Sequence, residues 1–528
     1  MIKVDSFRNL LFEAHTHFGD KPFLFDDPLL GRVSYSDVLR FATGLKETLD
    51  QLGVAEGDTV ATIFHNCGMA ALLFLGVIVS GRIVVPLNPA SPPDECEYVL
   101  SRANCETVIM DPGHVRSSSY GNRRVIPIID HRLKFEQLSR NGHADLPSNE
   151  GDGPVRRRAG EIVFTSGSTG RPKGVVLSEL NLLSNAHAIA QAYDFRANDR
   201  FLTVCPLFHN SGQVFTTLAC ALAGGSTVAV KSDLGMVHFW SYVERYRPQW
   251  SFVMSSLLAV LLADRKAIVP EHARMMRGMG TGGAAIDGPM IARFESRFGV
   301  PVRTVYGLTE TASIATCEPI NPEPRSLGSS GRPLPICEVR IDPAVTSTRE
   351  SVGGDAHVRG EIIICGPTVF DHYIGDPEMT QLRKREEWLR TGDVGYFDEN
   401  GNLFVIDRLD SMLIVSGEKV YPAEIERLCA SLPGAAQIVL AGVSHPILGT
   451  ELVLVYRAEG DKVPPIRQWQ QILAGRVTGF KLPKRYVSLA DLGLKEFPTT
   501  SNGKLDRRSI AALVTSSVGG EGTTAFKG

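Results

Sequence analysis

The chain has 528 residues, with 55 basic and 58 acidic side chains and a formal net charge of -3. Its length predicts more than one domain, because single hydrophobic cores stop growing at about 300 residues. Hydrophobic residues make up 43% and charged residues 21%, which excludes a disordered chain. The near balance of charge excludes a protein that binds nucleic acid or an anionic membrane through charge alone. Nine cysteines without a Cys-x-x-Cys pair disfavour a zinc ribbon or a secreted disulfide framework.

The longest apolar stretch, residues 70–79, ends at Ser80-Gly81-Arg82. A membrane span needs about 20 apolar residues, so this stretch is predicted to be a buried helix that leads into a strand. Residues 1–8 carry charges where a signal peptide has an apolar core. These features, with the unpaired cysteines, predict a cytoplasmic protein without a membrane span.

Helical and extended patterns alternate over the first 110 residues. A helix, a strand, a helix, a strand, a helix and a strand are expected in that order, over residues 35–52, 59–64, 68–79, 82–87, 94–102 and 107–110. This alternation predicts a parallel sheet covered by helices. Residues 112–160 are polar and rich in Ser, Gly and Arg, and we interpret them as a loop-rich insertion.

The pattern changes further along the chain. Alternation resumes over residues 161–305, whereas residues 325–407 have the short strands and turns of a small β-barrel or sheet. The residues after Asp410 have a βαβ-like pattern of their own. We predict an α/β fold in which a large N-terminal domain of helix-covered sheets, with a small β-barrel-like subdomain, precedes a small mobile α+β domain. The predicted boundaries are 1–408 and 409–515, followed by a disordered tail over 516–528.

The strongest chemical signal is a hydroxyl-rich loop that follows an apolar strand at Ile162-Val-Phe-Thr165. Its residues are Ser166-Gly-Ser-Thr-Gly170, with Lys173 shortly after. Glycines let backbone N–H groups approach an anion, hydroxyls add donors and a lysine adds positive charge. Ser178 can cap the helix that follows, so the predicted order is strand, phosphate-type loop, helix. The string is not a Walker A loop, and its composition alone also fits a flexible surface turn.

Further motifs follow this loop in a fixed order, and together they resemble the adenylate-forming superfamily of acyl-CoA synthetases, peptide-synthetase adenylation domains and luciferases. The resemblance covers residues 23–508, nearly the whole chain. The motifs are Pro206-Leu-Phe-His209, Gly282-Gly-Ala-Ala, Tyr306-Gly-Leu-Thr-Glu-Thr311, Thr391-Gly-Asp393, Asp407-Arg-Leu-Asp410, Ser416-Gly-Glu-Lys-Val-Tyr-Pro-Ala-Glu424 and Pro498-Thr-Thr-Ser-Asn-Gly-Lys504.

The resemblance implies ATP- and Mg²⁺-dependent activation of a carboxylic acid to acyl-AMP with release of pyrophosphate, and then transfer to a thiol. Both reactants are anions, so positioning and charge neutralisation are most of the catalysis. By resemblance, Glu310 holds Mg²⁺ with Thr165, Thr309 donates to the α-phosphate, and Lys504 bridges the carboxylate and the α-phosphate. His209 completes the expected catalytic set and also lines the acyl pocket.

The remaining expected site residues also come from the resemblance. Nucleotide binding is assigned to Thr165, Ser166, Gly167, Ser168, Thr169, Gly170, Lys173, Gly282, Gly283, Ala284, Tyr306, Gly307, Asp393 and Arg408. The acyl pocket is assigned to His209, Asn210, Met254, Gly282 and Gly331, the interdomain hinge to Asp410, and the thiol channel to Ser416, Gly417 and Glu418.

The segment after Pro206-Leu-Phe bears on the choice of acid. Relatives that activate amino acids carry an aspartate there to pair with the substrate ammonium, but no Asp or Glu occurs between Arg200 and Ser232. Burying an unpaired ammonium is costly, so an α-amino acid is not the expected substrate. Asn210 could donate to a ring hydroxyl or carbonyl, so aryl, oxygenated alicyclic and fatty acids all remain open.

The acyl acceptor is expected to be CoA, because Ser416-Gly417-Glu418 and Phe480-Lys-Leu-Pro-Lys484 resemble acyl-CoA synthetases. Lys419 and Asp410 depart from the residues that many CoA ligases have. A stand-alone enzyme that loads a separate carrier protein, or passes acyl-AMP to a partner enzyme, is therefore the alternative. A non-catalytic nucleotide-binding module is the non-enzyme alternative, and a homodimer is also compatible with the sequence.

Overall fold

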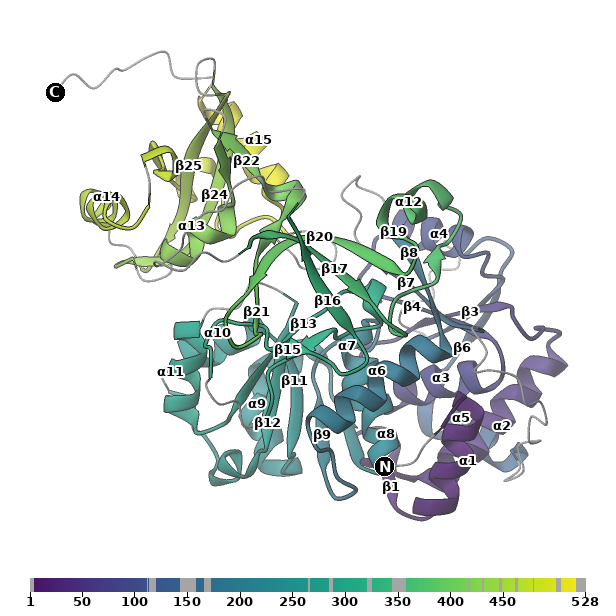
Figure 1. Cartoon of the computed structure of the whole chain (residues 1–528). Coiled ribbons are helices and arrows are strands. Elements are labelled where there is room, and N and C mark those ends of the chain that lie inside the picture. The colour runs from purple at the N-terminus through teal and green to yellow at the C-terminus, as the bar shows by residue number, and fades with distance from the viewer. Residues whose placement is uncertain are drawn as a thin grey trace. The chain divides into compact units, whose positions relative to one another are not determined.

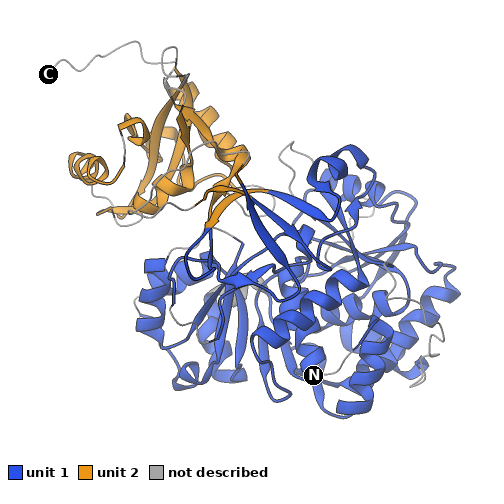
Figure 2. Ribbon diagram, in the orientation of Figure 1, with its two compact units in different colours: residues 1–342, 362–391, 397–404 blue, residues 343–361, 392–396, 405–528 orange. Residues whose placement is uncertain are grey.

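The computed structural model describes residues 4–111, 113, 120–142, 158–165, 172–264, 266–283, 288–320, 325–343, 358–415, 418–429, 432–445, 449–460, 464–477, 479–499 and 505–518. The chain forms two compact units, which Figure 2 colours separately. The first unit comprises residues 1–342, 362–391 and 397–404, and the second comprises residues 343–361, 392–396 and 405–528.

A seven-stranded sheet in the first unit contains the strands expected in the first 110 residues (Figure 1). The strand order is β18-β8-β7-β4-β3-β5-β6, and β3, β4, β5 and β6 run parallel. Its strands are β3 (Thr59–Ile63), β4 (Ile83–Leu87), β5 (Thr107–Met110), β6 (Arg124–Pro127), β7 (Ala159–Thr165), β8 (Lys173–Ser178) and β18 (His372–Tyr373). The parallel sheet predicted from the alternation is confirmed.

The helices of this region begin and end where local chemistry favours it. The Ser34 hydroxyl accepts from the Asp37 N–H, and the Asp37 carboxylate accepts from the Ser34 N–H, which forms a capping box at the start of α2. Helix α3 is apolar on nearly every side and is buried, as the stretch 70–79 predicts. The helices are α1 (Phe7–Phe18), α2 (Tyr35–Gln51), α3 (Gly68–Val79), α4 (Pro93–Arg102), α5 (His131–Asn141) and α6 (Glu179–Ala192).

The interpretation of residues 112–160 as loop is wrong for part of that range, because it contains β6 and α5. Strand β6 pairs in parallel with β5, and α5 begins at the Asp130 side chain, which accepts from the Leu133 N–H. Both elements have few buried residues, so their sequences lack the apolar periodicity that the prediction relied on.

A nine-stranded sheet in the same unit has the order β15-β14-β13-β12-β11-β9-β10-β1-β2. Its strands are β1 (Pro22–Asp27), β2 (Gly31–Ser34), β9 (Arg200–Thr203), β10 (Ser226–Ala229), β11 (Trp250–Met254), β12 (Gly278–Gly282), β13 (Val302–Tyr306), β14 (Thr316–Cys317) and β15 (Arg332–Pro333). Helices α7 (Asn210–Gln213), the π-helical η2 (Val214–Leu218) and α8 (Ala219–Ala223) lie between β9 and β10 in the chain, and α9 (Ser232–Tyr246), α10 (Ser255–Ala263) and α11 (Gly288–Phe298) follow them.

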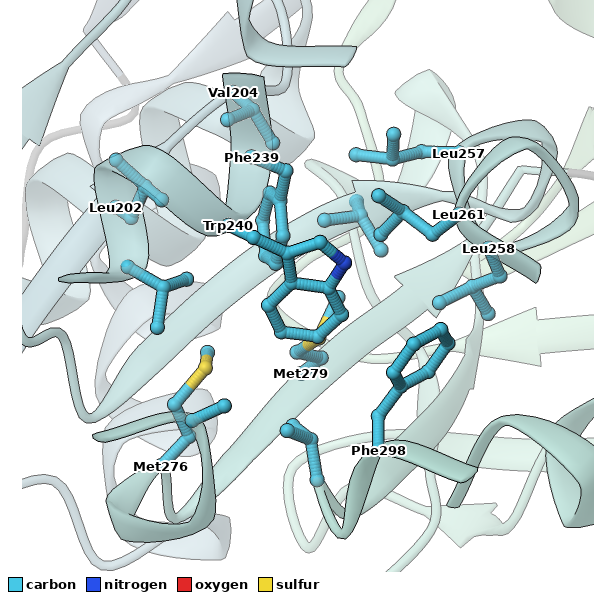
Figure 3. Close-up of a cluster of buried hydrophobic side chains, with 14 of the residues drawn as sticks. Leu202, Val204, Phe239, Trp240, Leu257, Leu258, Leu261, Met276, Met279 and Phe298 are labelled. Atoms are coloured by element: carbon cyan, nitrogen blue, oxygen red, sulfur yellow. The ribbon is translucent and has the colours of Figure 1, made fainter. Parts of the chain in front are cut away.

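One face of the nine-stranded sheet packs on these later helices through a large apolar cluster (Figure 3). Phe239 and Trp240 of α9 meet Phe298 of α11, and the Trp240 and Phe298 ring centroids are 4.8 Å apart. Met279 of β12 and Val253 of β11 belong to the same cluster. This packing fixes strands β11 and β12, which end at the expected acyl-pocket residues Met254 and Gly282.

A five-stranded sheet contains β16 (Glu338–Asp342), β17 (Gly360–Cys365), β19 (Lys384–Arg385), β20 (Trp388–Phe397) and β21 (Leu403–Arg408). These strands fit the predicted β-rich subdomain, and unit boundaries fall within β17, β20 and β21. Helix α12 (Pro377–Arg383) begins at Asp376, whose side chain accepts from the Met379 N–H.

The second unit has an α+β core around the sheet β24-β25-β26. Leu440 and Leu454 pack with α13 and α14, whereas Val439 and Val453 pack with α15. Alternate side chains of each strand therefore point to opposite faces of the sheet. The elements are β22 (Leu413–Val415), β23 (Glu418–Val420), α13 (Pro422–Cys429), β24 (Ala435–His445), β25 (Gly449–Ala458), α14 (Ile466–Ala474), β26 (Arg485–Ser488) and α15 (Arg507–Val518). The α/β fold class with a smaller α+β region is confirmed, while the boundary after residue 408 stays a prediction.

Two further sequence expectations concern membranes and cysteines. Among the described helices, none combines the length and the apolar character that a membrane crossing requires. All nine cysteines are unpaired, and eight are buried while Cys365 is partly exposed. No two of these cysteines are joined by a disulfide in the structure.

Candidate functional site

The hydroxyl-rich loop connects the two strands of a hairpin. Strands β7 and β8 are antiparallel, and Thr165 is directly opposite Lys173. Residues Ser166, Gly167, Ser168, Thr169 and Gly170 lie outside the described residues. The predicted order was strand, loop and then a helix capped by Ser178. Strand β8 lies between the loop and that helix, and its residues Val175, Val176 and Leu177 are buried. The predicted cap is confirmed, since the Ser178 side chain accepts from the Asn181 N–H at the start of α6.

Strand β18 connects this hairpin to the Tyr306–Thr311 motif. Tyr373 of β18 pairs with Val175 of β8, and the Tyr373 hydroxyl donates to Glu310 Oε1 over 2.6 Å. The Lys173 Nζ lies 5.8 Å from the centroid of the Tyr373 ring. Burial, and then the negative charge of Glu310, raises the pKa of Tyr373, so its phenol remains a donor. The structure thus brings the predicted residues Lys173 and Glu310 together through a tyrosine that the sequence reasoning missed.

The Glu310 carboxylate lies in a short 3₁₀ turn, η4 (Thr309–Thr311), that follows β13. Glu310 is 8% exposed, and its carbonyl accepts from the Phe370 N–H over 2.8 Å. Thr309 is partly buried at the start of the turn. A Cβ on Gly307 would lie 1.9 Å from the Ser313 carbonyl oxygen, so only glycine permits the chain to fold back over this turn.

Three expected residues lie at the carboxyl ends of adjacent parallel strands. Met254 ends β11, Gly282 ends β12 and Tyr306 ends β13, and Met254 is the register partner of Gly282. Ligands of open α/β sheets bind at this edge. Gly283 has a φ of 82°, and a Cβ there would lie 2.8 Å from the Met254 Cε. Ala284 lies outside the described residues.

His209 and Asn210 begin α7, the helix after the Pro206-Leu-Phe motif. His209 is half-buried at the N-cap, with its ring centroid 4.7 Å from that of Phe208. Asn210 is buried, and its Nδ2 donates to Glu161 Oε2 over 3.0 Å. The expected donor to a substrate therefore already contacts a carboxyl group from β7.

Glu161 is the other residue that sequence reasoning missed. Its side chain is completely buried, and burial raises its pKa to about 8, with the Gln213 and Asn210 amides opposing the rise. The only sequence signal was a charged residue inside the apolar strand Gly160-Glu-Ile-Val-Phe164. Glu161 lies outside residues 200–232, where an acidic partner for a substrate ammonium would be expected, because it belongs to strand β7.

Gly331 is buried against the backbone of β14. A Cβ on this residue, which has a φ of 73°, would lie 2.1 Å from the Cys317 carbonyl oxygen. Its carbonyl accepts from the Leu403 N–H over 2.7 Å. The glycine therefore has a structural role at the edge of the sheet in addition to its expected place in the acyl pocket.

The second unit brings together three of the predicted residues. Arg408 Nη1 lies 3.3 Å from Asp393 Oδ1, and Arg408 Nε donates to Asp410 Oδ1 over 3.0 Å. Asp393 is 6% exposed. Arg408 thus connects the expected ribose-binding aspartate to the expected hinge. Glu418 is exposed at the start of β23 and pairs with Val415, while Ser416, Gly417 and Lys504 lie outside the described residues.

The chemistry of Glu310 fits Mg²⁺. A carboxylate and phosphate oxygens are the hard ligands that this ion prefers, and sites for it typically use one or two carboxylates with substrate phosphates. The Tyr373 hydrogen bond orients the Glu310 carboxylate. Within the described ranges, no group of three or more His, Cys, Asp or Glu residues could hold a metal ion.

A hollow of about 320 Å³ lies next to this region. Tyr373 lines it together with His372, Gly375, Asp376, Pro377, Thr380 and Gln381. None of the residues predicted for nucleotide or acyl binding is among these, so the hollow does not define the substrate site.

Comparisons with known proteins agree with the motifs. The profile of the family described as AMP-binding enzyme matches residues 11–374. Sulfoacetate–CoA ligase of Cupriavidus necator is 28% identical over 523 residues, covering 96% of this chain and 97% of the relative. Oxalate–CoA ligase of Arabidopsis thaliana is 28% identical, covering 87% of this chain and 89% of the relative.

Solved structures share the fold. ATP-bound MatB from Rhodopseudomonas palustris has a TM-score of 0.82 and 24% identity, covering 96% of this chain and 99% of that one. The o-succinylbenzoate CoA synthetase MenE from Bacillus subtilis, in complex with its acyl-adenylate intermediate, has a TM-score of 0.79 and 23% identity, covering 95% and 97%. At these identities the likeness establishes the fold.

Proposed function

The chain belongs to the AMP-binding enzyme family, and from this premise we propose that it is a carboxylic acid–CoA ligase. It activates the acid with ATP and Mg²⁺ to acyl-AMP, releases pyrophosphate and transfers the acyl group to CoA. The observation that carries the proposal is the Glu310–Tyr373 pair beside Lys173, because it places an oriented carboxylate and a cation next to the loop expected to hold phosphates. The two relatives named above are CoA ligases that align with this chain over most of their length, which supports CoA as the acceptor.

The proposed roles in the first half-reaction follow from charge. The carboxylate of the substrate and the α-phosphate repel each other, so cations and N–H groups must neutralise both. Lys173 and the hydroxyl-rich loop bind phosphate oxygens, and Thr309 donates to the α-phosphate. Glu310 and Thr165 hold Mg²⁺, which supplies positive charge to the leaving pyrophosphate. Lys504 bridges the two reacting anions.

The proposed roles of the second unit concern the ribose and the change between half-reactions. Asp393 and Arg408 bind the ribose hydroxyls, and the Asp393 carboxylate offers two acceptor oxygens for them. Asp410 acts as the hinge between domain 1–408 and the mobile domain 409–515, and Ser416, Gly417 and Glu418 line the path of the thiol. ATP and CoA are intracellular cosubstrates, which supports a cytoplasmic location.

The acid is proposed to lack an α-amino group. The buried carboxyl group beside Asn210 is Glu161, and its raised pKa keeps it largely uncharged below about pH 8, so it offers no fixed counter-ion for an ammonium. The relatives named above act on sulfoacetate and on oxalate, which are small acids without an amine.

A separate carrier protein, or a partner enzyme that receives acyl-AMP, is the second candidate acceptor. The observation that favours it is the pair of departures Asp410 and Lys419 from residues that many CoA ligases have. Supplying CoA, or a phosphopantetheinylated carrier protein, to enzyme that has formed labelled acyl-AMP distinguishes the two acceptors.

Exchange of labelled pyrophosphate into ATP tests the first half-reaction across short dicarboxylic, sulfonated, aryl and fatty acids. Exchange with at least one acid class and its loss in Glu310→Gln are the expected results, with Glu399→Gln as an exposed control of equal charge change. Absence of exchange with every class would refute the catalytic proposal. Formation of acyl-CoA, followed by mass spectrometry, then tests the second half-reaction.

A further inference from the structure

A cluster of buried polar side chains lies beside the start of α7, and the proposed chemistry does not use it. Glu161 of β7 and Gln213 of α7 have no exposed surface, and Asn210 is 4% exposed. The Asn210–Glu161 hydrogen bond is the one that joins them. Among the described residues, Glu161 Oε1, Asn210 Oδ1 and both polar atoms of the Gln213 amide have no hydrogen-bond partner. The Gln213 amide is close enough to oppose the rise in the Glu161 pKa, although it falls short of hydrogen-bond geometry.

The cluster has more hydrogen-bond acceptors than donors without a partner. Its atoms without a partner are three acceptor oxygens and one amide nitrogen, if Glu161 is a carboxylate. A proton on Glu161 converts one of these acceptors into a donor and gives an amide oxygen a partner. Leaving a buried polar group without a partner is unfavourable, so the carboxylic acid form suits this cluster better than the carboxylate.

The segment on which this cluster acts, residues 205–213, is fixed at its other end by Asn66. Asn66 Nδ2 donates to the Cys205 carbonyl over 2.7 Å, and its Oδ1 accepts from the Leu207 N–H over 2.7 Å. A Cβ on Gly212 would lie 2.9 Å from the same Cys205 carbonyl, so the helix packs directly on the preceding loop. Asn66 therefore holds residues 205 and 207, and Glu161 holds residue 210.

His209 lies between these two anchors. Its N–H donates to the Pro206 carbonyl over 3.1 Å, and its own carbonyl accepts from the Gly212 N–H over 3.2 Å. The π-helical η2 begins directly after Gln213, and such widened turns occur frequently at functional sites. A displacement of Asn210 would therefore move the backbone that orients the His209 ring.

We propose that Glu161 is a positioning residue for the acyl-binding region, and that its carboxylic acid group holds the Asn210 and Gln213 amides and so fixes His209. This inference rests on the proposed function, in which His209 lines the acyl pocket. Glu161 does not contact the substrate. Its effect appears in the KM for the acid, because it sets the geometry of the pocket rather than the chemistry at the α-phosphate.

The proton that this role requires is retained at neutral pH, because burial raises the pKa of Glu161 to about 8. The residues directly opposite Glu161 on the neighbouring strands, Val84 of β4 and Leu177 of β8, are uncharged, and the side chains that oppose the rise in its pKa are the Gln213 and Asn210 amides. On residues 205–213 the titratable side chains are His209 and Cys205, and burial raises the pKa of Cys205 to about 12. Any contribution of His209 to the pH profile would persist when Glu161 is replaced, which separates the two groups.

The test compares wild type, Glu161→Gln and Glu161→Leu in the complete enzyme. KM and kcat for the best acid are measured in pyrophosphate exchange between about pH 6 and pH 9, and hydrogen exchange of residues 205–213 is followed by mass spectrometry. The glutamine side chain keeps the shape of glutamic acid and has an N–H donor at every pH, whereas the leucine side chain has no donor. We expect the wild-type KM to rise about threefold or more from pH 7 to pH 9, and the Glu161→Gln KM to stay level. We expect Glu161→Leu to raise KM about tenfold at pH 7 and to speed exchange in residues 205–213.

Glu179→Gln is the matched control, because Glu179 is a carboxyl in the same unit that accepts from the Phe7 N–H over 2.8 Å, far along the chain from α7. It should leave KM and the exchange of residues 205–213 at wild-type values. If Glu161→Leu does not fold, the comparison of wild type with Glu161→Gln decides. Superimposable KM profiles of those two proteins would overturn the inference.

Two other results would also be decisive. If wild type prefers an acid with an ammonium group and Glu161→Gln loses that preference, Glu161 is a counter-ion of the substrate and the positioning role is overturned. If wild type shows no exchange with any acid, the proposed function fails. Hydrogen exchange then still decides whether Glu161 fixes residues 205–213, and unchanged exchange in Glu161→Leu would refute that.

Discussion

Replacing Glu161 by glutamine should remove one strong pH dependence from the stability of the protein. Burial raises the pKa of this carboxyl from its ordinary 4.5 to about 8 in the folded protein. Between these values the folded protein holds the proton and the unfolded chain has released it. Unfolding therefore becomes easier as pH rises, and the stabilising contribution of Glu161, complete below about pH 4.5, is lost as pH approaches 8. Glutamine has no such proton.

The size of the effect follows from the displaced pKa. Each pH unit within the window from 4.5 to about 8 changes the free energy of unfolding by about 1.4 kcal/mol, so the whole window corresponds to roughly 5 kcal/mol. The difference in stability between Glu161→Gln and wild type should grow by this amount in favour of the variant, and should level off above about pH 8.

Urea unfolding at several values of pH from 5 to 9, followed by circular dichroism, measures this difference. Taking the difference between two proteins cancels every other group that titrates in both. Glu399→Gln, in an exposed turn, corrects for the removal of one carboxyl group. A stability difference that is the same at every pH would show that Glu161 does not hold a proton in the folded protein, and would refute the reasoning.

The remaining predictions concern catalysis. Tyr373→Phe removes the hydrogen bond that orients Glu310. The loss of roughly 1 kcal/mol should raise the Mg²⁺ concentration for half-maximal pyrophosphate exchange about fivefold. An unchanged Mg²⁺ titration would contradict this. Lys504→Ala should abolish pyrophosphate exchange but retain thiolysis of supplied acyl-AMP, because the bridged charges exist only during adenylation. Gly417→Leu should do the reverse, since a side chain would obstruct the thiol, and equal loss of both steps in these two variants would refute the division. Asp410→Pro should slow the complete reaction more than either half-reaction measured alone, because proline stiffens the hinge; equal rates would exclude hinging there.

The sequence predicts well those elements that are buried on nearly every side. Helix α3 and strand β5 have the predicted bounds, because each is a continuous, mostly apolar and buried run of residues with distinct ends. Strand β6 and helix α5 were missed, because β6 has no buried residue and α5 has one, Leu138, so neither shows an apolar pattern.

The residues of the candidate site also differ in whether the sequence could predict them. Motifs that keep their residues adjacent in the chain, such as Tyr306–Thr311, could be found from the sequence and resemblance. Tyr373 and Glu161 could not, because each acts through a partner 63 or 49 residues away along the chain. Strand pairing brings them there, and the register of β18 on β8 is not visible in a linear pattern.

The burial of the cysteines gives the protein a set of internal reporters. Burial raises the pKa of Cys205 to about 12, so almost no nucleophilic thiolate exists at neutral pH while the fold is closed. An alkylating reagent should therefore modify it at the rate at which the loop before α7 opens, whereas the partly exposed Cys365 should react earlier. Labelling kinetics at Cys205, with Cys365 as the more accessible reference, can thus follow local opening around His209 without introducing a dye site or changing any residue of the pocket.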